Sequence, residues 1–194
     1  EYGANIEAAN RKSRSFDYSV CGELTKVETV DTKTIEEVAT FLIILKSQTI
    51  KAVIKKAIYE DKTQIVVFFV RGDDELEETK ASNSVNALEL DEASENEIIE
   101  AGLVAGYCGP FGLPSNITFV IDNEIKDAKG LACGANEINY HLINTDLSTL
   151  ENAKYFDLVA VQEGDSCSCC GGALKYRKGI EAGHIFQLGT KYSA

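Results

Sequence analysis

Three polar residues beside apolar stretches could do chemistry: Lys51, Asp122 and His141. A lysine ammonium can bind a phosphate and can stabilise negative charge that develops on a carbonyl oxygen. Asp122 could position a water molecule or a lysine, and it could equally be the polar end of a strand. His141 is one of only two histidines, and a single histidine is most often a structural residue. Residue type alone therefore leaves both the reactive and the structural roles open.

A segment rich in glycine and proline, residues 106–114, is the second candidate. It reads Gly-Tyr-Cys-Gly-Pro-Phe-Gly-Leu-Pro and holds both prolines of the chain and three glycines. This composition predicts a shaped loop rather than a regular element. Because glycine has no Cβ, the backbone can approach a ligand closely there, and neighbouring amides could hold an oxygen atom. On spacing alone, a purely structural turn is the favoured alternative.

The six cysteines are the third possible source of chemistry. Cys167 and Cys170 have the Cys-x-x-Cys spacing of half a zinc knuckle, but zinc needs a second pair of ligands. Cys21, Cys108 and Cys133 are each isolated in the sequence. We therefore expect reduced thiols and no metal site. Cys108 lies in the glycine-rich loop, yet no histidine lies close in sequence to activate it as a nucleophile.

Length and composition limit the class of protein. A chain of 194 residues with 44% apolar and 26% charged residues is expected to form one domain with short extensions. No apolar run is long enough to cross a bilayer, so we expect a soluble, cytoplasmic protein without a membrane partner. The net charge of −12 argues against non-specific nucleic-acid binding. No Gly-x-Ser-x-Gly, His-Glu-x-x-His or P-loop motif occurs, so no self-contained hydrolase is indicated by motif.

Local patterns predict the helices that must position these residues. Two pairs with capping-box spacing, Thr34 with Glu37 and Ser94 with Glu97, each precede apolar residues. The apolar residues after the first pair recur at helical period. Helices are therefore expected over 34–46 and 95–102, and a short acidic helix is expected over 74–78.

The strand signals are strongest in the middle of the chain. The β-branched and aromatic run from Gln64 to Val70 predicts a central, fully buried strand. Alternation from Ile117 to Asp122 predicts a strand that ends at the carboxylate. The segment 50–59 fits a helix or a strand. Shorter strands are expected at 27–30, 142–143 and 158–161. Short strands with few helices predict the α+β class.

Both ends of the chain resemble a known family. The run from Lys178 to Ser193 is Lys-Gly-Ile-Glu-Ala-Gly-His-Ile-Phe-Gln-Leu-Gly-Thr-Lys-Tyr-Ser. It is similar to the signature of bacterial prolyl-tRNA synthetases at the point where the chain re-enters the class II core. Residues 1–7 resemble the stretch of that family just before the chain leaves the core. The resemblance implies a lead-in over 1–20, an inserted editing domain over 21–174 and a return segment over 175–194. Such insertions are similar to YbaK-type deacylases, which implies a mixed β-sheet/barrel core with surrounding helices.

The interior matches the motifs of the same family. Lys51 stands where the family has a lysine of the deacylation pocket, and Asp122 follows in the expected order. The resemblance implies that these two residues are catalytic. It implies substrate-binding roles for the residues of a Gly-x-x-x-Pro motif and a Gly-Ala-Asn…His element: Gly106, Tyr107, Cys108, Gly109, Pro110, Gly134, Ala135, Asn136 and His141.

The function implied by the resemblance is hydrolysis of the ester bond of alanyl-tRNA of the proline type, without a metal or cofactor. A synthetic site built for proline cannot strongly reject a smaller residue, since one methylene is worth only about 1–3 kcal/mol, so a second pocket removes the wrong product. The implied partners are a tRNA acceptor end carrying alanine and the remainder of the synthetase, expected to be a homodimer. The class II motifs are absent, so the chain itself should not ligate proline.

Two other functions stay open. A non-catalytic insertion could position the tRNA acceptor end or shape the synthetic site, and the acidic net charge favours it. A zinc-stabilised structural insertion is a weaker alternative. Three features depart from the family pattern. Asp74 stands in place of His and Glu77 in place of Asn, the segment after His141 is shortened, and Val159 stands where an arginine often occurs.

Overall fold

The structure is a computed structural model of the chain and describes residues 3–14, 22–151 and 153–179. Most of the expected return segment, residues 180–194, lies outside the described residues, as does Cys21. The implied division into lead-in, inserted domain and return segment therefore stays a prediction.

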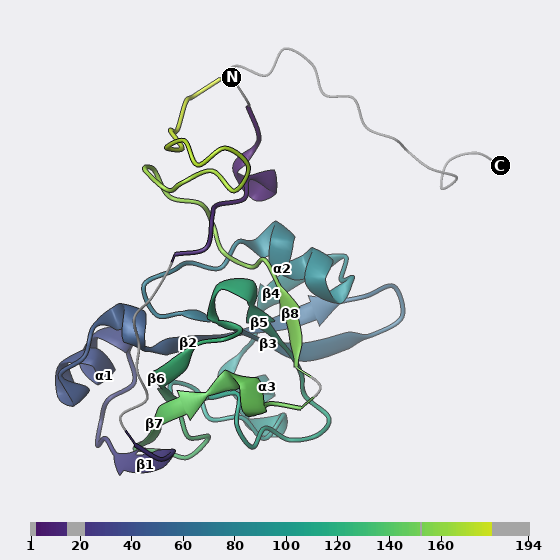
Figure 1. The fold of residues 1–194 in the computed structure, drawn as a ribbon. Coiled ribbons are helices and arrows are strands. Elements are labelled where there is room, and N and C mark those ends of the chain that lie inside the picture. The colour runs from purple at the N-terminus through teal and green to yellow at the C-terminus, as the bar shows by residue number, and fades with distance from the viewer. Residues whose placement is uncertain (1–2, 15–21, 152, 180–194) are drawn as a thin grey trace.

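A five-stranded mixed sheet forms the centre of the molecule (Figure 1). Its strands, in order across the sheet, are β4 (Glu89–Glu92), β2 (Ile50–Ile58), β3 (Thr63–Arg71), β5 (Thr118–Asp122) and β8 (Lys154–Phe156). β2 and β3 form an antiparallel hairpin, while β5 and β8 continue the sheet in parallel. The predicted buried strand is confirmed, since residues 66–70 of β3 are fully buried.

Hydrophobic cores lie on both faces of this sheet because alternate side chains of β3 point to opposite sides. Val67 and Phe69 pack with β5 and the second sheet, whereas Val66, Phe68 and Val70 pack under the helix that follows β3. The second sheet is antiparallel, in the order β1 (Thr25–Glu28), β7 (Tyr140–Asp146) and β6 (Lys129–Gly134). A parallel bridge from Thr49 to Ala132 joins the two sheets.

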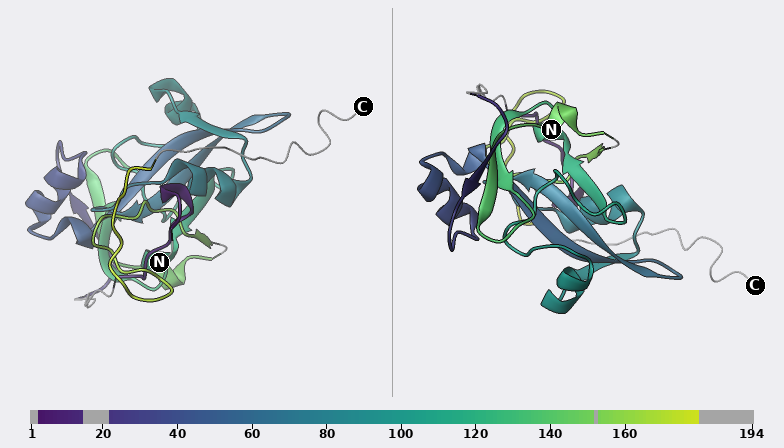
Figure 2. Two further views of the ribbon diagram at one scale, coloured as in Figure 1. Left: turned by 90° about the horizontal axis from the view of Figure 1, so that it is seen from above. Right: turned by 90° about the horizontal axis from the view of Figure 1, so that it is seen from below.

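In the part of the chain that the structure describes, three helices and four 3₁₀ turns accompany the strands: α1 (Ile35–Leu42), α2 (Glu78–Val85), α3 (Glu95–Glu100), η1 (Ile6–Ala8), η2 (Lys46–Gln48), η3 (Asn123–Ile125) and η4 (Leu147–Thr149). Both predicted capping boxes are present, at Thr34 with Glu37 and at Ser94 with Glu97. Both views of Figure 2 place α1 and the turn between β2 and β3 at opposite ends of the body. No helix within the described ranges is long and apolar enough to span a membrane.

Several predicted boundaries are wrong. α1 ends at Leu42 rather than at residue 46, because Ile43 has a left-handed backbone (φ 56°). The acidic helix begins at Glu78 rather than at Asp74, because Asp74 is fully buried in ion pairs. The segment 158–161 makes only one isolated bridge, and β4, β6 and β8 were not predicted. The ambiguous segment 50–59 is the strand β2.

The first and last described segments pair with each other outside the two sheets. The Lys12 N–H donates to the carbonyl oxygen of Ser166 at 2.7 Å, and Arg11 forms an antiparallel bridge with Cys167. Figure 1 shows them together at the top of the molecule, above the larger sheet.

Candidate active site

A cavity of ≈ 360 Å³ opens where the starts of α1 and β2 meet the turn region between β6 and β7. Five of the predicted site residues line it: Lys51, Gly106, Cys108, Gly134 and His141. The lining combines apolar side chains with a few polar groups, as is usual for sites that bind small molecules. The structure therefore brings together residues from four separate parts of the sequence.

Lys51 is the second residue of β2 and lines this cavity. It pairs across the sheet with Val70 of β3, so the buried strand fixes its backbone. Its Nζ lies 3.0 Å from Oε1 of Glu75, which also lines the cavity. The side chains are 22% and 80% exposed, respectively. Because such exposed pairs contribute only about 0–1 kcal/mol, a substrate can take over the ammonium at little cost.

The glycine-rich loop 106–114 and the loop that begins at Gly134 touch through their backbones beside the cavity. A Cβ added at Gly109 would lie 1.9 Å from the carbonyl oxygen of Gly134. A Cβ added at Gly134 would lie 2.1 Å from the carbonyl oxygen of Tyr107. The Asn136 side chain fixes this crossing. Its Oδ1 accepts from the Gly109 N–H at 3.0 Å, and its Nδ2 donates to the carbonyl oxygens of Gly109 at 3.0 Å and Phe111 at 2.7 Å. Gly109 and Asn136 thus shape the loop and do not line the cavity.

His141 forms one wall of the cavity as an uncharged ring. Its Nδ1 is hydrogen-bonded to Oγ1 of Thr29 at 2.6 Å, and its ring centroid lies 5.5 Å from that of Tyr107. The Tyr107 hydroxyl donates to Oδ1 of Asn139 at 2.9 Å. Burial lowers the pKa of His141 to about 4, so the imidazole is neutral at pH 7.

Cys108 and Cys133 contribute two buried thiols to the cavity lining. Burial raises the pKa of Cys108 to about 12, and burial also raises the pKa of Cys133. Both thiols are therefore protonated at neutral pH. A protonated thiol is a poor nucleophile, which argues against catalysis by Cys108.

Asp122 lies at the end of β5, as predicted, but does not line the cavity. Its two carboxylate oxygens accept the backbone N–H groups of Glu124 at 2.8 Å and Leu158 at 2.7 Å. Burial raises the pKa of Asp122 to about 6. Tyr107, Gly109, Pro110, Ala135 and Asn136 likewise stand behind the lining rather than in it.

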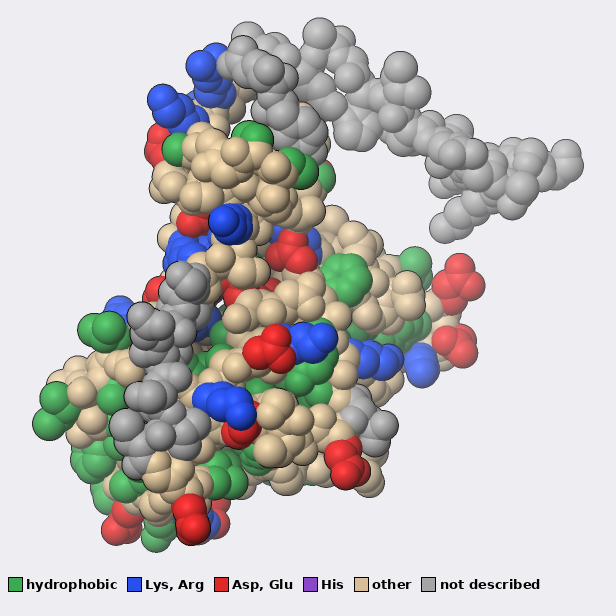
Figure 3. Space-filling model, viewed as in Figure 1, with side chains coloured by type: hydrophobic (Ala, Val, Ile, Leu, Met, Phe, Trp, Pro, Cys, Tyr) green, Lys and Arg blue, Asp and Glu red, His purple; other side chains and the backbone are tan. Residues whose placement is uncertain are grey.

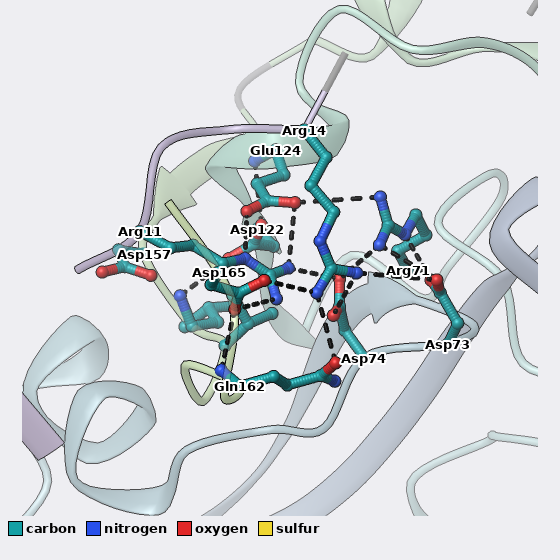
Figure 4. A network of polar contacts seen from close by, with 12 residues as sticks. Arg11, Arg14, Arg71, Asp73, Asp74, Asp122, Glu124, Asp157, Gln162 and Asp165 are labelled. Carbon is teal, nitrogen blue, oxygen red and sulfur yellow. Dashed lines mark hydrogen bonds and ion pairs between the residues drawn. The ribbon is translucent and has the colours of Figure 1, made fainter. Parts of the chain in front are cut away.

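Figure 4 shows a buried network of ion pairs. Arg11 reaches Asp74 at 2.6 Å and Glu124 at 2.5 Å, and Arg71 lies 3.3 Å from Asp74. Arg71 is the last residue of β3 and directly precedes Gly72, which lines the cavity. The network therefore connects the paired terminal segments to the cavity wall, and Asp74 forms ion pairs with both arginines.

Sequence reasoning missed Thr29, Lys33 and Glu75. Lys33 and Glu75 line the cavity, and Thr29 anchors His141 from 112 positions away. No local pattern connects Thr29 with His141. Lys33 directly precedes the capping residue Thr34, and this position is the one signal that placed it near the start of a helix.

The Cys-x-x-Cys segment forms a tight turn that does not line the cavity. The Cys167 N–H donates to the carbonyl oxygen of Gly172 at 2.8 Å, and the Gly171 N–H donates to that of Cys167 at 2.9 Å. Cys167 is buried, whereas Cys169 and Cys170 are exposed. Across residues 3–14, 22–151 and 153–179, no three His, Cys, Asp or Glu side chains are placed to hold a metal ion.

Comparison with solved structures agrees with this architecture. The fold is similar to hypothetical protein APE2540, with a TM-score of 0.62 and 22% identity over 71% of this chain and 91% of that one. It is also similar to a structure described as a candidate trans-editing enzyme for prolyl tRNA synthetase, with a TM-score of 0.59 and 22% identity over 71% of this chain and 87% of that one. The α+β fold with mixed sheets is thus confirmed.

Curated relatives match the chain from end to end. The proline–tRNA ligase of Aliarcobacter butzleri (strain RM4018) is 72% identical over 194 residues, and that of Campylobacter concisus (strain 13826) is 54% identical. In both cases the match covers the whole chain and 34% of the relative, so the chain spans about a third of these enzymes. Residues 29–150 match the family model of the aminoacyl-tRNA editing domain. The chain therefore belongs to the aminoacyl-tRNA editing domain family.

Proposed function

We propose that the chain is the editing domain of a prolyl-tRNA synthetase and hydrolyses the ester bond of alanyl-tRNA(Pro). Membership of the editing-domain family supports the activity, and the proline–tRNA ligase relatives support the parent enzyme. The observation that carries the proposal is that the Lys51 side chain and a neutral His141 line the same cavity. The proposed partners are the alanine-carrying tRNA end and the rest of a homodimeric synthetase. Residues 1–20 and 175–194 would connect the domain to it.

The proposed reaction adds water to the ester that joins alanine to the terminal ribose, and it releases alanine and free tRNA. Negative charge develops on the carbonyl oxygen as water attacks. Lys51 can leave the exposed carboxylate of Glu75 and stabilise this charge or hold the neighbouring ribose or phosphate. No thiol is assigned as a nucleophile, because burial keeps Cys108 and Cys133 protonated.

Selectivity is assigned to one part of the cavity lining. His141, Cys133 and Gly134 form it, and the neutral imidazole adds no charge that would favour a polar side chain. The close backbone contact between Gly109 and Gly134, together with the Asn136 hydrogen bonds, holds this part of the wall in place. Asp122 is assigned a positioning role, since it holds the start of η3 and the backbone of Leu158.

The proposal is tested by incubating the protein with alanyl-tRNA(Pro) and, separately, with prolyl-tRNA(Pro). We expect release of alanine and retention of proline. If the protein releases neither amino acid, the assay is repeated with the domain inside its complete synthetase. Absence of alanine release there would establish a non-catalytic insertion instead.

A further inference from the structure

Three thiols lie at the tip of a chain reversal near the end of the described residues. The reversal spans residues 164–174, and across it the Leu174 N–H donates to the carbonyl oxygen of Asp165 at 2.7 Å. We call its tip, residues 167–172, the thiol turn, and its cysteines are Cys167, Cys169 and Cys170. Figure 3 shows the described terminal segments as a lobe above the body of the molecule, and the thiol turn belongs to this lobe. Its thiols are therefore distinct from the two that line the active-site cavity.

The thiol turn brings Cys167 and Cys170 within reach of a disulfide. The Gly171 N–H donates to the carbonyl oxygen of Cys167 at 2.9 Å, and the Cys167 N–H donates to that of Gly172 at 2.8 Å. A turn keeps the Cα atoms of residues three positions apart within about 7 Å, and a disulfide joins Cα atoms up to about 6.8 Å apart. Gly171 has φ 71°, a left-handed backbone that glycine adopts without strain. The backbone therefore holds the two cysteines close together while both are still thiols.

The backbone of the thiol turn favours the thiolate of Cys167. Hydrogen bonds from the backbone N–H groups of Cys170 and Cys169 to its sulfur lower the pKa of Cys167. The thiolate is the form that attacks a disulfide, so this cysteine is suited to react first. Cys170 is exposed and follows three positions later, where it is placed to react with the Cys167 sulfur in turn. Burial instead raises the pKa of Cys108 and Cys133, which keeps those two thiols unreactive.

A second cavity, of ≈ 530 Å³, gives a small molecule access to Cys167. Cys167 and Cys169 both line it, although Cys167 is only 8% exposed. Lys175 and Arg177 line it too, and Glu163 is the one acid among the described residues of this lining. A small disulfide that carries carboxylates therefore meets two cations and one acid beside the sulfur.

We propose that Cys167 and Cys170 form a reversible dithiol site, which a small peptide disulfide such as oxidised glutathione converts to an intramolecular disulfide. The site does not depend on the proposed deacylase activity, because the lining of its cavity shares no residue with the lining of the active-site cavity. It lies where the terminal segments meet. The Ser168 N–H donates to the carbonyl oxygen of Asn10 at 3.4 Å, and Arg11 forms its bridge with Cys167. The redox state of the pair therefore bears on the contact between these segments.

The oxidation proceeds in two exchange steps. The Cys167 thiolate attacks one sulfur of the small disulfide, whose S–S bond breaks, and one half leaves and takes up a proton as a free thiol. The Cys170 thiolate then attacks the Cys167 sulfur, forms the intramolecular bond and expels the second half in the same way. Two cysteine thiols lose two electrons and two protons in total, and one small disulfide is reduced to two thiols. An added dithiol runs the same steps in reverse.

The test treats the reduced 194-residue protein with an excess of oxidised glutathione as the probe. Free thiols are then blocked with N-ethylmaleimide, and the digested protein is analysed by mass spectrometry. The peptide that contains the thiol turn should have lost two hydrogens and should carry one maleimide, on Cys169. Dithiothreitol should return all three thiols of the turn to the reduced form. A wild-type protein that keeps these three thiols free in excess probe would overturn the proposal.

Two serine variants at exposed positions separate this pair from a general reaction of exposed thiols. Cys170→Ser should retain one glutathione on Cys167, because the thiolate that would expel it is gone. Cys169→Ser is the matched control, since it removes the neighbouring exposed thiol, and it should form the disulfide at the wild-type rate. Loss of two hydrogens in Cys170→Ser, or no disulfide in Cys169→Ser, would show that a different pair reacts.

A third variant tests which sulfur attacks first. Cys167→Ser should take up glutathione roughly 10-fold more slowly than Cys170→Ser, because the sulfur that accepts the two backbone N–H groups is gone. Circular dichroism and urea unfolding under reducing conditions check that it folds, since Cys167 is buried. Equal rates in these two folded variants would refute the order of attack. Metal analysis tests the other chemistry of such a turn: thiols that hold zinc as purified and react only after chelation would make the proposal wrong.

Discussion

The Oγ1 atom of Thr29 lies 2.6 Å from Nδ1 of His141, and both residues are buried. This contact joins the segment after β1 to the start of β7 and holds the imidazole ring against the cavity. The ring has no freedom to turn without breaking a buried hydrogen bond. The part of the cavity wall formed by His141 is therefore set by a residue outside the cavity lining.

Replacing Thr29 by valine should weaken this wall. The change keeps the shape of the side chain but leaves Nδ1 of His141 without its partner, so the free energy of unfolding should fall by about 1–3 kcal/mol. The ratio of kcat/KM for alanyl-tRNA over prolyl-tRNA should also fall. Urea unfolding and deacylation assays measure the two effects. Thr29→Ser keeps the hydroxyl and should behave like the wild type, and equal selectivity in Thr29→Val would contradict the role of the contact.

Stability should depend on pH through His141. Its folded pKa of about 4 lies below the ordinary value of 6.5, so the unfolded chain takes up the proton first as the pH falls. The contribution of His141 is complete above about pH 6.5 and is lost as the pH falls towards 4, by about 2 kcal/mol at about pH 5. Asp122 acts in the opposite sense, because burial raises its pKa to about 6. Urea unfolding of the wild type and His141→Gln across this range isolates the histidine, and parallel curves would refute the prediction.

The contact between the two loops predicts that Gly109 tolerates no side chain. Gly109→Ala places a methyl group 1.9 Å from the carbonyl oxygen of Gly134, so one loop must move. We expect the free energy of unfolding to fall by about 1–3 kcal/mol, with loss of deacylation. Gly172→Ala is the control, since its Cβ would meet only the Cys170 Sγ at 3.5 Å. An active, stable Gly109→Ala protein would show that the crossing does not shape the site.

The buried ion pairs predict unequal effects for two neighbouring arginines. The Arg11 side chain is 2% exposed and pairs with Asp74, Glu124 and Asp165, whereas Arg14 is 29% exposed. Arg11→Gln should lower the free energy of unfolding by about 3–5 kcal/mol, because it leaves buried carboxylates without their cation. Arg14→Gln should lower it by less than about 1 kcal/mol. Thermal or urea unfolding compares them, and similar losses would contradict the assignment of Arg11 as the centre of the network.

Elements with local signals were predictable from the sequence. The central strand β3 follows from one apolar run. The starts of α1 and α3 follow from their capping boxes, in which the two residues are three positions apart. The motif matches also placed Lys51, Gly106, Gly134 and His141, which do meet at one cavity. Their roles there stay predictions.

Features set by distant contacts were not predictable. The bond from Thr29 to His141 and the ion pair from Arg11 to Asp74 span 112 and 63 positions, so no periodic pattern reveals them. Asp74 was predicted to start a helix because it lies in an acidic segment. Its burial depends on an ion pair with the distant Arg11, which no local pattern reveals. The apolar period of α1 predicted a core face, but the helix stops at Leu42 and leaves Phe41 and Leu45 exposed.

The most direct test of the account is deacylation of alanyl-tRNA(Pro) by Lys51→Ala beside Lys129→Ala, which removes an exposed lysine that also pairs with a carboxylate. We predict that Lys51→Ala lowers kcat by about 10²-fold or more, as for other lost charge-stabilising groups, while its unfolding free energy stays within about 1 kcal/mol of the wild type. Lys129→Ala should keep full activity. Unchanged hydrolysis by a folded Lys51→Ala protein would contradict the account and place the chemistry elsewhere.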